Sequence, residues 1–181
     1  MKRFSRLFVF LVLAACASSP KLNYYTLSAE SSGNSQPAVN LDVQRFQTTE
    51  ALSRSGILIA ASPTRVEYYA TDQWVGGLAE LVRQKLTVEF GEQVEGRRNL
   101  AMTAVVLACE QVDVAGGTEA RMKLSVTVRD PAEKRYREPL LSKTYEASRP
   151  MAHSSADSVV VALSICAEQI AADIASDASG L

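Results

Sequence analysis

The stretch Ala120-Arg121-Met122-Lys123-Leu124-Ser125-Val126-Thr127-Val128-Arg129 decides the fold of this chain. Apolar and polar residues alternate along it without interruption, which is the period of a half-buried β-strand. Its polar face carries a basic row made of Arg121, Lys123 and Arg129. Such a row is usually a solvated face, although it could also meet acidic lipid headgroups or a partner protein.

The segment before it, Leu100 to Val114, is ambiguous because residues 100–108 are apolar on both faces. A buried helix and a fully buried strand would both explain this pattern. Since Ala115-Gly116-Gly117 joins it directly to the alternating strand, we predict a second strand and a hairpin. We favour a central strand with small residues, covered by a loop; the alternative is a sheet face that binds a lipid or a partner subunit.

Further strand-like segments flank this pair, and each is bounded by turn-forming residues. They are Leu22–Leu27, Val39–Phe46, Gly56–Ala60, Arg65–Tyr69 and Leu141–Glu146. The second and third of these enclose a connector, and the third and fourth enclose Ser62-Pro63, where we expect a hairpin.

Two segments have the 3.6-residue period of amphipathic helices. Thr71 can cap the first, from Asp72 to about Phe90, with Trp74 on its apolar arc; Lys85 and Glu89 fall inside that arc and are expected to snorkel at its edge.

The second predicted helix starts with Ser154 and Asp157, a capping-box pattern, and has an apolar stripe from Val159 to Ile174. The order of strands, helix, three strands and helix predicts an α+β fold, an antiparallel β-sheet with two amphipathic helices packed on one face.

The N-terminus has the pattern of an export signal. Three basic residues at positions 2, 3 and 6 precede the apolar run Leu7–Leu13, which ends in the small pair Ala14-Ala15. The run is much shorter than the roughly 20 residues of a membrane-spanning helix. We therefore divide the chain into a signal peptide (1–15), a tether (16–21), a single α+β domain (22–175) and a frayed tail (176–181).

Composition and charge exclude several classes of function. Without the signal peptide, 16 basic and 20 acidic residues remain, a net charge of −4. This balance argues against nucleic-acid binding, which needs a basic surface. With one histidine and no Cys-x-x-Cys motif, neither a metal site nor a cofactor is expected. Cys109 and Cys166 are candidates for a disulfide or are two small buried hydrophobes, and the sequence does not favour either.

No catalytic constellation is expected. His153 lies beside Ser154, Ser155 and Asp157, but sequence neighbours at a helix start rarely have the geometry of a catalytic triad. The pairs Gly76-Gly77 and Gly116-Gly117 lack the strand–turn–helix context of a phosphate-binding loop. A hydrolase that uses His153 is the weakest alternative.

Leu13-Ala14-Ala15-Cys16 resembles the lipobox of bacterial lipoproteins. The resemblance implies that Cys16 becomes the first residue after cleavage and carries fatty acids such as palmitate, which anchor the chain without spanning the membrane. Ala17 follows in place of the aspartate that retains lipoproteins at the inner membrane, so the resemblance implies the outer membrane, facing the periplasm.

The motifs after the lipobox resemble the ABC-type transport auxiliary lipoproteins, the PqiC-like group. They are Tyr24-Tyr25-Thr26-Leu27, Ser53-Arg54-Ser55-Gly56-Ile57-Leu58-Ile59, Tyr68-Tyr69, Trp74 with Leu78 and Leu86, and the closing amphipathic helix. The resemblance implies a non-enzymatic subunit of an envelope lipid transport system, working with an inner-membrane ABC transporter and an MCE-domain protein. The alternative is a carrier that binds a lipid on its open sheet face; homo-oligomerisation stays open.

Overall fold

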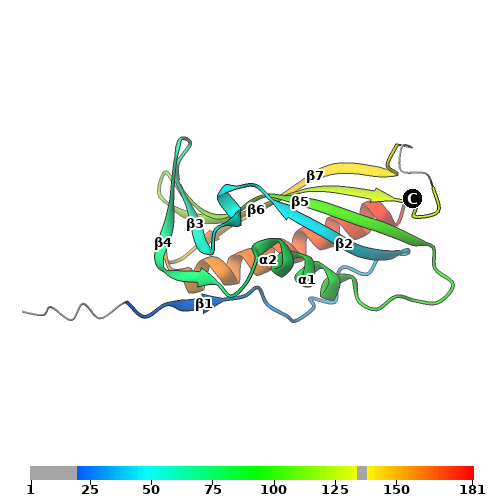
Figure 1. The fold of residues 1–181 in the computed structure, drawn as a ribbon, viewed down its shortest axis with the longest axis horizontal. Helices are drawn as coiled ribbons and strands as arrows, with labels where there is room; N and C mark the ends of the chain where they lie inside the picture. Colours follow the sequence, from blue (N-terminus) through cyan, green and yellow to red (C-terminus); the bar gives the residue numbers. More distant parts are fainter. Residues whose placement is uncertain (1–19, 134–137) are drawn as a thin grey trace, which may run out of the picture.

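The structure is a computed structural model that describes residues 20–133 and 138–181 (Figure 1). The predicted signal peptide and Cys16 lie outside these residues. The elements, in chain order, are β1 (Asn23–Tyr25), β2 (Asn40–Thr48), a 3-10 helix (Ala51–Ser53), β3 (Gly56–Ser62), β4 (Arg65–Trp74), α1 (Leu78–Phe90), β5 (Asn99–Val114), β6 (Gly117–Arg129), β7 (Leu141–Met151) and α2 (Ala156–Ala178).

The strands form one seven-stranded sheet in the order β1-β4-β3-β5-β6-β7, with β2 also paired to β5. The long strand β5 is its spine: β6 covers one edge, while β2 and β3 share the other, at residues 99–106 and 110–112 of β5 respectively. Both helices lie on the same side of the sheet (Figure 1). The predicted α+β class with two helices is confirmed.

The sheet is mixed, whereas a purely antiparallel one was expected. The pairs β3–β4, β5–β6 and β6–β7 are antiparallel, and β1–β4, β2–β5 and β3–β5 are parallel. A parallel pair needs a crossover connection, most often through a helix. α1 lies in the connection from β2, β3 and β4 to β5, so it supplies that crossover.

The alternation of apolar and polar residues in β6 matches an alternation of buried and partly exposed side chains. The apolar residues face the helices and are all fully buried: Ala120, Met122, Leu124, Val126 and Val128. In β5, Leu100, Met102, Ala104 and Val106 are buried on the same side, but Leu107 on the open side is 39% exposed. The apolar open face of β5 is therefore not covered by a loop of the described chain.

The first helix begins later than predicted. Asp72 to Trp74 continue β4: Trp74 is paired with Tyr25 of β1, and its backbone N–H donates to the carbonyl of Ser55 at 2.7 Å. Thr71 is therefore not a helix cap. Gly76-Gly77 separate the strand from α1, which begins at Leu78 with Gly77 as its N-cap. Trp74 is buried at this strand end, with 3% of its surface exposed. An apolar residue fits a buried strand end as well as the apolar face of a helix, so the sequence pattern did not distinguish them.

α2 differs from its prediction at both ends. Ser155, not Ser154, is the N-cap, and its hydroxyl accepts from the N–H of Ser158 at 3.3 Å. The predicted apolar stripe is buried. The helix continues to Ala178, which is fully buried, so a frayed tail from residue 176 is wrong. Asp177 explains this: it accepts hydrogen bonds from Lys143 (2.7 Å) and Tyr145 (2.6 Å) of β7.

By length and composition α2 could cross a membrane, since its most apolar window has a mean hydropathy of 1.6. However, 61% of that window is buried inside the protein, and the helix packs on β5, β6, β7 and α1. α2 is therefore the core helix of this domain.

Replacing a stripe residue of α2 tests this core. Ile170 is fully buried, so Ile170→Ala is expected to lower the free energy of unfolding by about 2–5 kcal/mol through lost burial and a cavity. Val161 lies on the same helix but is 62% exposed, and Val161→Ala should change it by no more than about 0.5 kcal/mol. Urea unfolding followed by circular dichroism measures both. Equal losses would contradict the assignment of the buried face.

Candidate functional site

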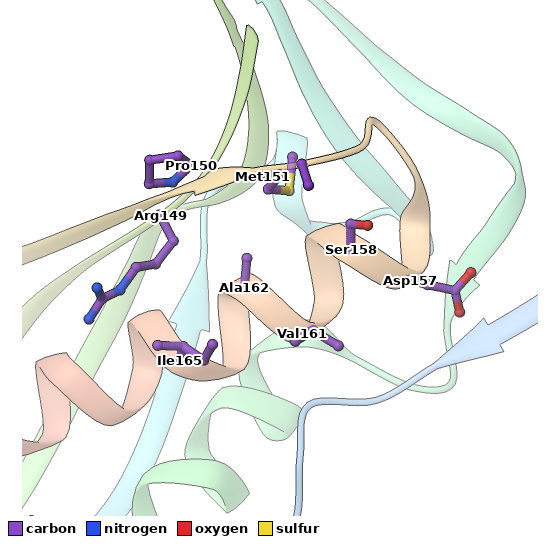
Figure 2. A pocket seen from close by; sticks show the side chains of 9 residues that line it. Arg149, Pro150, Met151, Asp157, Ser158, Val161, Ala162 and Ile165 are labelled. Carbon is purple, nitrogen blue, oxygen red and sulfur yellow. The ribbon is translucent and has the colours of Figure 1, made fainter.

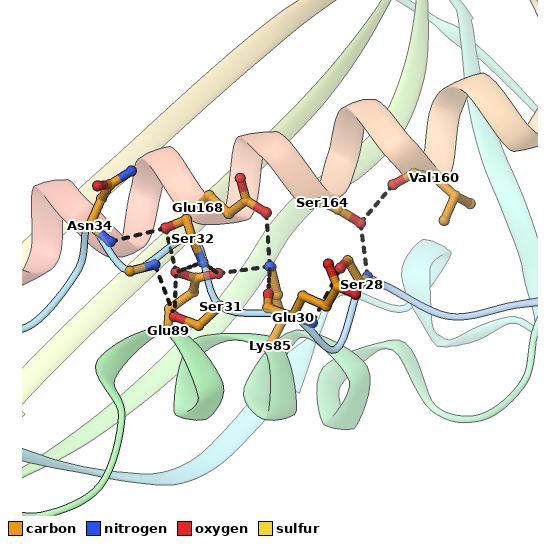
Figure 3. Close-up of polar contacts among 11 residues, drawn as sticks. Ser28, Glu30, Ser31, Ser32, Asn34, Lys85, Glu89, Val160, Ser164 and Glu168 are labelled. Atoms are coloured by element: carbon orange, nitrogen blue, oxygen red, sulfur yellow. Dashed lines mark hydrogen bonds and ion pairs between the residues drawn. The ribbon is translucent and has the colours of Figure 1, made fainter.

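The segment that follows β1 crosses the helical side of the domain between α1 and α2 (Figures 1 and 3). We call residues 27–38 the strap. Leu27 is 3% exposed, the N–H of Ser28 donates to the hydroxyl of Ser164 on α2 at 3.0 Å, and the N–H of Ala38 donates to Ser179 at 3.0 Å. The strap is thus fastened to α2 near both of its ends.

The middle of the strap is held by a buried ion pair (Figure 3). Lys85 of α1, 2% exposed, donates to Glu89 (2.7 Å), to Glu168 of α2 (2.9 Å) and to the carbonyl of Glu30 in the strap (2.7 Å). An ammonium group has three N–H donors, so all of them are used. Lys85 therefore joins α1, α2 and the strap at one point.

Glu89 binds the strap directly. Its carboxylate accepts from the N–H of Ser32 (3.1 Å) and from the Ser32 hydroxyl (2.7 Å), in addition to Lys85. Burial raises the pKa of Glu89, but the hydrogen bonds from Lys85 and Ser32 outweigh it, and the net pKa is lowered from its ordinary value of 4.5. Glu89 is thus held in its charged form by the strap and by Lys85.

Lys85 and Glu89 were expected to snorkel at the edge of the apolar arc, and this expectation was wrong. Their side chains are 1% and 0% exposed. Helical spacing placed both inside the arc, but the partners that satisfy them, Glu30, Ser32 and Glu168, are 55 to 83 residues away from Lys85 or Glu89 in sequence. No local pattern could have shown that these charges are buried.

Strand β1 fixes where the chain from the predicted anchor enters the domain. The chain is paired from Asn23 onward, because Asn23–Tyr25 form β1 against β4, and the strap follows directly. Between Cys16 and β1 only a few residues remain, which reach about 20 Å when extended. β1, the β3–β4 hairpin and the start of α2 all lie at one end of the domain (Figure 1).

At this end an apolar groove runs between β7 and the outer side of α2 (Figure 2). We call it the α2–β7 groove; its volume is about 450 Å³. It is lined by Arg149, Pro150, Met151, Ala152, Asp157, Ser158, Val161, Ala162 and Ile165. A second depression shares Arg149 and Ile165 with it and continues along α2 to Ala172, with Ser32 and Asn34 of the strap on its far side. The groove and the strap therefore flank the same helix.

Charges lie at separate places along this groove. Arg149 extends from β7 across α2 beside Ile165 (Figure 2), and it makes no ion pair or side-chain hydrogen bond within residues 20–133 and 138–181. Asp157 lies at the other end and points away from the groove centre (Figure 2). It contributes to raising the pKa of Tyr25 in β1, after burial as the larger cause.

The basic row predicted on β6 lies on the open face of the sheet, but it is not an unbalanced cationic surface. Arg121 pairs with Glu110 of β5, and Lys123 pairs with Glu146 of β7 at 2.8 Å. Arg129 is the last residue of β6. Each neighbouring strand thus contributes a carboxylate to the row, and the face has mixed charge.

Cys109 and Cys166 are both buried free thiols in the structure. Cys166 of α2 lies over β6, with its Sγ 3.8 Å from the carbonyl of Ala120. Burial raises the pKa of both thiols, that of Cys166 to about 11. They therefore pack as small apolar side chains here, and a disulfide between them stays a prediction.

The residues considered for catalysis are not brought together as a triad. The Ser154 hydroxyl exchanges hydrogen bonds with Gln111 of β5 (3.0 and 3.2 Å), and the Ser155 hydroxyl caps α2. Residue 153 is exposed in the turn before the helix, and Asp157 faces β1. No group of three or more metal-binding side chains is present in the part of the chain that the structure describes.

Comparison with known proteins gives the family. The family model for the ABC-type transport auxiliary lipoprotein component matches residues 25–175. This range covers most of the chain. The chain belongs to this family. No curated protein matches it significantly.

Two solved structures share the fold of this family member. A crystal structure of a Xanthomonas campestris protein has a TM-score of 0.72 at 14% identity and covers 84% of this chain and 92% of its own. The crystal structure of an uncharacterized protein has a TM-score of 0.67, also at 14% identity, over 87% and 99%. At this identity the likeness shows the fold alone. The matched family is described as a transport auxiliary lipoprotein component.

Sequence reasoning missed both the ion pair and the groove. A signal existed for the groove: Val161 and Ile165 are four residues apart on α2, outside the stripe that was assigned to the core. The partner wall, Arg149 to Met151, could not be found in the same way because it belongs to another element.

Removing the cation of the buried pair should destabilise the domain. Lys85→Met leaves Glu89 buried without its counter-ion, and we expect a loss of about 3–5 kcal/mol in the free energy of unfolding. Lys85→Met with Glu89→Leu should recover most of that loss, because no buried charge is left unpaired. Amide hydrogen exchange at Ser28 and Ser32 should rise in the single variant.

The control is Lys143→Met. Its ion pair with Asp177 is exposed, with the Lys143 side chain 51% accessible, and such pairs contribute about 0–1 kcal/mol. A loss in Lys85→Met no greater than in this control would contradict the role assigned to Lys85.

The lowered pKa of Glu89 predicts a direction for pH dependence. A carboxyl whose pKa is lower in the folded state stabilises the fold above its unfolded value, 4.5, and this contribution is lost as pH falls through the folded pKa. Wild type should therefore exceed Glu89→Gln in stability at about pH 7, and the difference should shrink as the pH falls to about 3. Thermal unfolding across that range measures it; a difference independent of pH would contradict the assignment.

Proposed function

We propose that this chain is a non-enzymatic outer-membrane lipoprotein of an ABC/MCE-type envelope lipid transport system, and that it docks or stabilises the periplasmic end of that system. Fatty acids on Cys16 would hold it at the membrane, and an MCE-domain protein and the ABC transporter subunits would be its partners. The family match over residues 25–175 supports the auxiliary role, and the strap supports the docking role.

The fastening of β1 and the strap carries this proposal, because it holds the chain to the domain from Asn23 onward and leaves only a short linker to Cys16. A domain on a long flexible linker samples a large volume, whereas a short linker limits its position. Here the chain is fastened from β1 through Ala38 by strand pairing, by Ser164 and by the Lys85 ion pair. A partner that approaches from the periplasm would meet the domain at a nearly fixed height above the membrane.

The open face of the sheet is the surface we assign to the protein partner. It holds Arg121 and Lys123, each paired with an acidic neighbour, and the exposed Leu107. Paired charges around an exposed apolar residue fit the polar rim and apolar core of a protein interface, whereas binding to the surface of an acidic membrane would need an unpaired basic cluster.

A carrier that itself binds a lipid is the second candidate, and the α2–β7 groove favours it. Ligand sites are concave and mostly apolar, with a few polar groups, and they have volumes of about 300–1,000 Å³. The groove meets this description on the helical side, whereas the depression on the open sheet face is smaller, about 280 Å³, and lined mostly by polar residues such as Arg45, Thr103 and Ser125. A lipid would therefore bind beside α2.

Removing the acylated thiol tests the anchor. Cys16→Ser should move the protein from the outer-membrane fraction to the soluble periplasmic fraction, because no fatty acid can be attached. Ala17→Asp keeps the acyl chains and should move it to the inner membrane. Density-gradient fractionation with immunoblotting measures both, and chemical crosslinking should co-isolate an MCE-domain protein with wild type only. An outer-membrane location of Cys16→Ser would refute the proposal.

A further inference from the structure

The α2–β7 groove combines apolar side chains that the fold leaves exposed. Val161 and Ile165 are 62% and 41% exposed, although α2 is otherwise the core helix. Figure 2 shows them on the outer side of α2, below the strand end that carries Met151. Neighbouring exposed apolar residues in a concave site indicate a ligand or partner more strongly than single ones do.

Arg149 is the one basic residue among the described residues that line the groove, and it indicates that the ligand is negatively charged. Arg149 lies on the side of β7 that faces α2, as do Tyr145 and Met151, by the two-residue period of a strand. It has no ion-pair partner in the described chain; Glu168, the acidic residue among those that line the second depression, is bound to Lys85. A guanidinium without a partner beside apolar residues fits a phosphate or carboxylate with an apolar tail.

The groove also has a direction. Asp157 lies at the end of α2 that is near β1, and Arg149 lies beside Ile165, eight residues further along. At 1.5 Å per residue this separation is about 12 Å. One leaflet of a bilayer has a hydrocarbon depth of about 15 Å, half of the whole core, so the apolar floor matches most of one acyl chain.

We propose that the α2–β7 groove binds an acyl chain of an anionic glycerophospholipid from the membrane that holds the anchor, with the phosphate on Arg149. The tail lies along Ile165, Val161 and Met151 toward the tethered end of the domain, and Asp157 repels the headgroup from that end. This is the orientation of a lipid in the adjacent leaflet, tail toward the membrane and phosphate toward the periplasm. The inference rests on the proposed function, because it names the lipid class that such a subunit would handle.

A peptide partner fits this groove less well. β7 is an edge strand, but Pro150 lacks an N–H to donate to an added strand, and an inward-pointing charge such as Arg149 is a known protection of sheet edges. The acyl chains of Cys16 are needed in the bilayer, since a single chain holds a protein only marginally.

Photocrosslinking tests the proposal on the mature lipidated protein in phosphatidylethanolamine vesicles. The probes are a phosphatidylglycerol and a diacylglycerol, each with a diazirine in the acyl chain, and labelled residues are mapped by mass spectrometry. We expect the phosphatidylglycerol probe to label residues 151–165. Arg149→Gln should lower this labelling about tenfold by loss of a charge-assisted phosphate contact, and leave labelling by the uncharged diacylglycerol unchanged.

Val161→Glu should abolish labelling by both probes, because it places a charge on the apolar floor of the groove. Since the Val161 side chain is exposed, the substitution leaves the core folded. The matched controls are Arg65→Gln and Val66→Glu on the β3–β4 hairpin, where the arginine and the valine are exposed; both should label as wild type does. Labelling outside residues 151–165, or labelling unaffected by Val161→Glu, would overturn the proposal.

Two other occupants give distinct results that also overturn it. If the groove shelters the chain's own acyl group, only Cys16→Ser will be labelled there. If it receives a protein, Val161→Glu will leave labelling unchanged and abolish co-isolation of the crosslinked partner. Because the labelling uses vesicles and purified protein, a negative labelling result does not affect the fractionation result for Cys16→Ser, and the two proposals can fail separately.

Discussion

The ammonium group of Lys85 is the constraint on which the helical side of this protein depends. It is buried between two helices and a segment without regular structure, and each of its donors is bound to a different one of them. A buried ion pair adds little net stability compared with apolar packing, but leaving one member unpaired is costly. The strap has few apolar side chains to bury, so the charges give it a single register. Any shift of the strap along the helices would remove the contact of Lys85 with the Glu30 carbonyl and those of Glu89 with Ser32.

How far the sequence predicts this structure depends on whether the signal is local. The strict alternation in β6 and the stripe in α2 each lie within one element, and both were found from their period alone. The start of α1 was misplaced because Trp74 is buried in a strand end as well as on a helix face, and the double glycine after it is a weak stop signal. The mixed pairing of β5 depends on which distant strands reach its edge, and no residue of β5 encodes that.

The candidate site was missed for the same reason, because its walls come from elements that are distant in sequence. The apolar pair of the groove is visible in the sequence, but the wall with Arg149 comes from β7. Likewise the basic row on β6 was found correctly as a row, while its meaning changed once Glu110 and Glu146 were seen on the neighbouring strands. Charges on a sheet are balanced across strands, so the charge of a face cannot be read from one strand. The net charge of the mature chain, mildly acidic, was the better guide.

The composition of α2 connects the core to the proposed lipid site. A helix that is apolar on all sides is normally either fully buried or in a membrane, and α2 meets the composition of a membrane span while being 61% buried in that window. Its inner stripe accounts for the packing against the sheet and α1. The apolar residues that this packing does not need, Val161 and Ile165, lie on the outer side of α2, where a polar residue would not destabilise the fold. Two neighbouring apolar side chains exposed in one groove are best explained by a ligand that covers them, and the unpaired Arg149 next to them favours an anionic amphiphile.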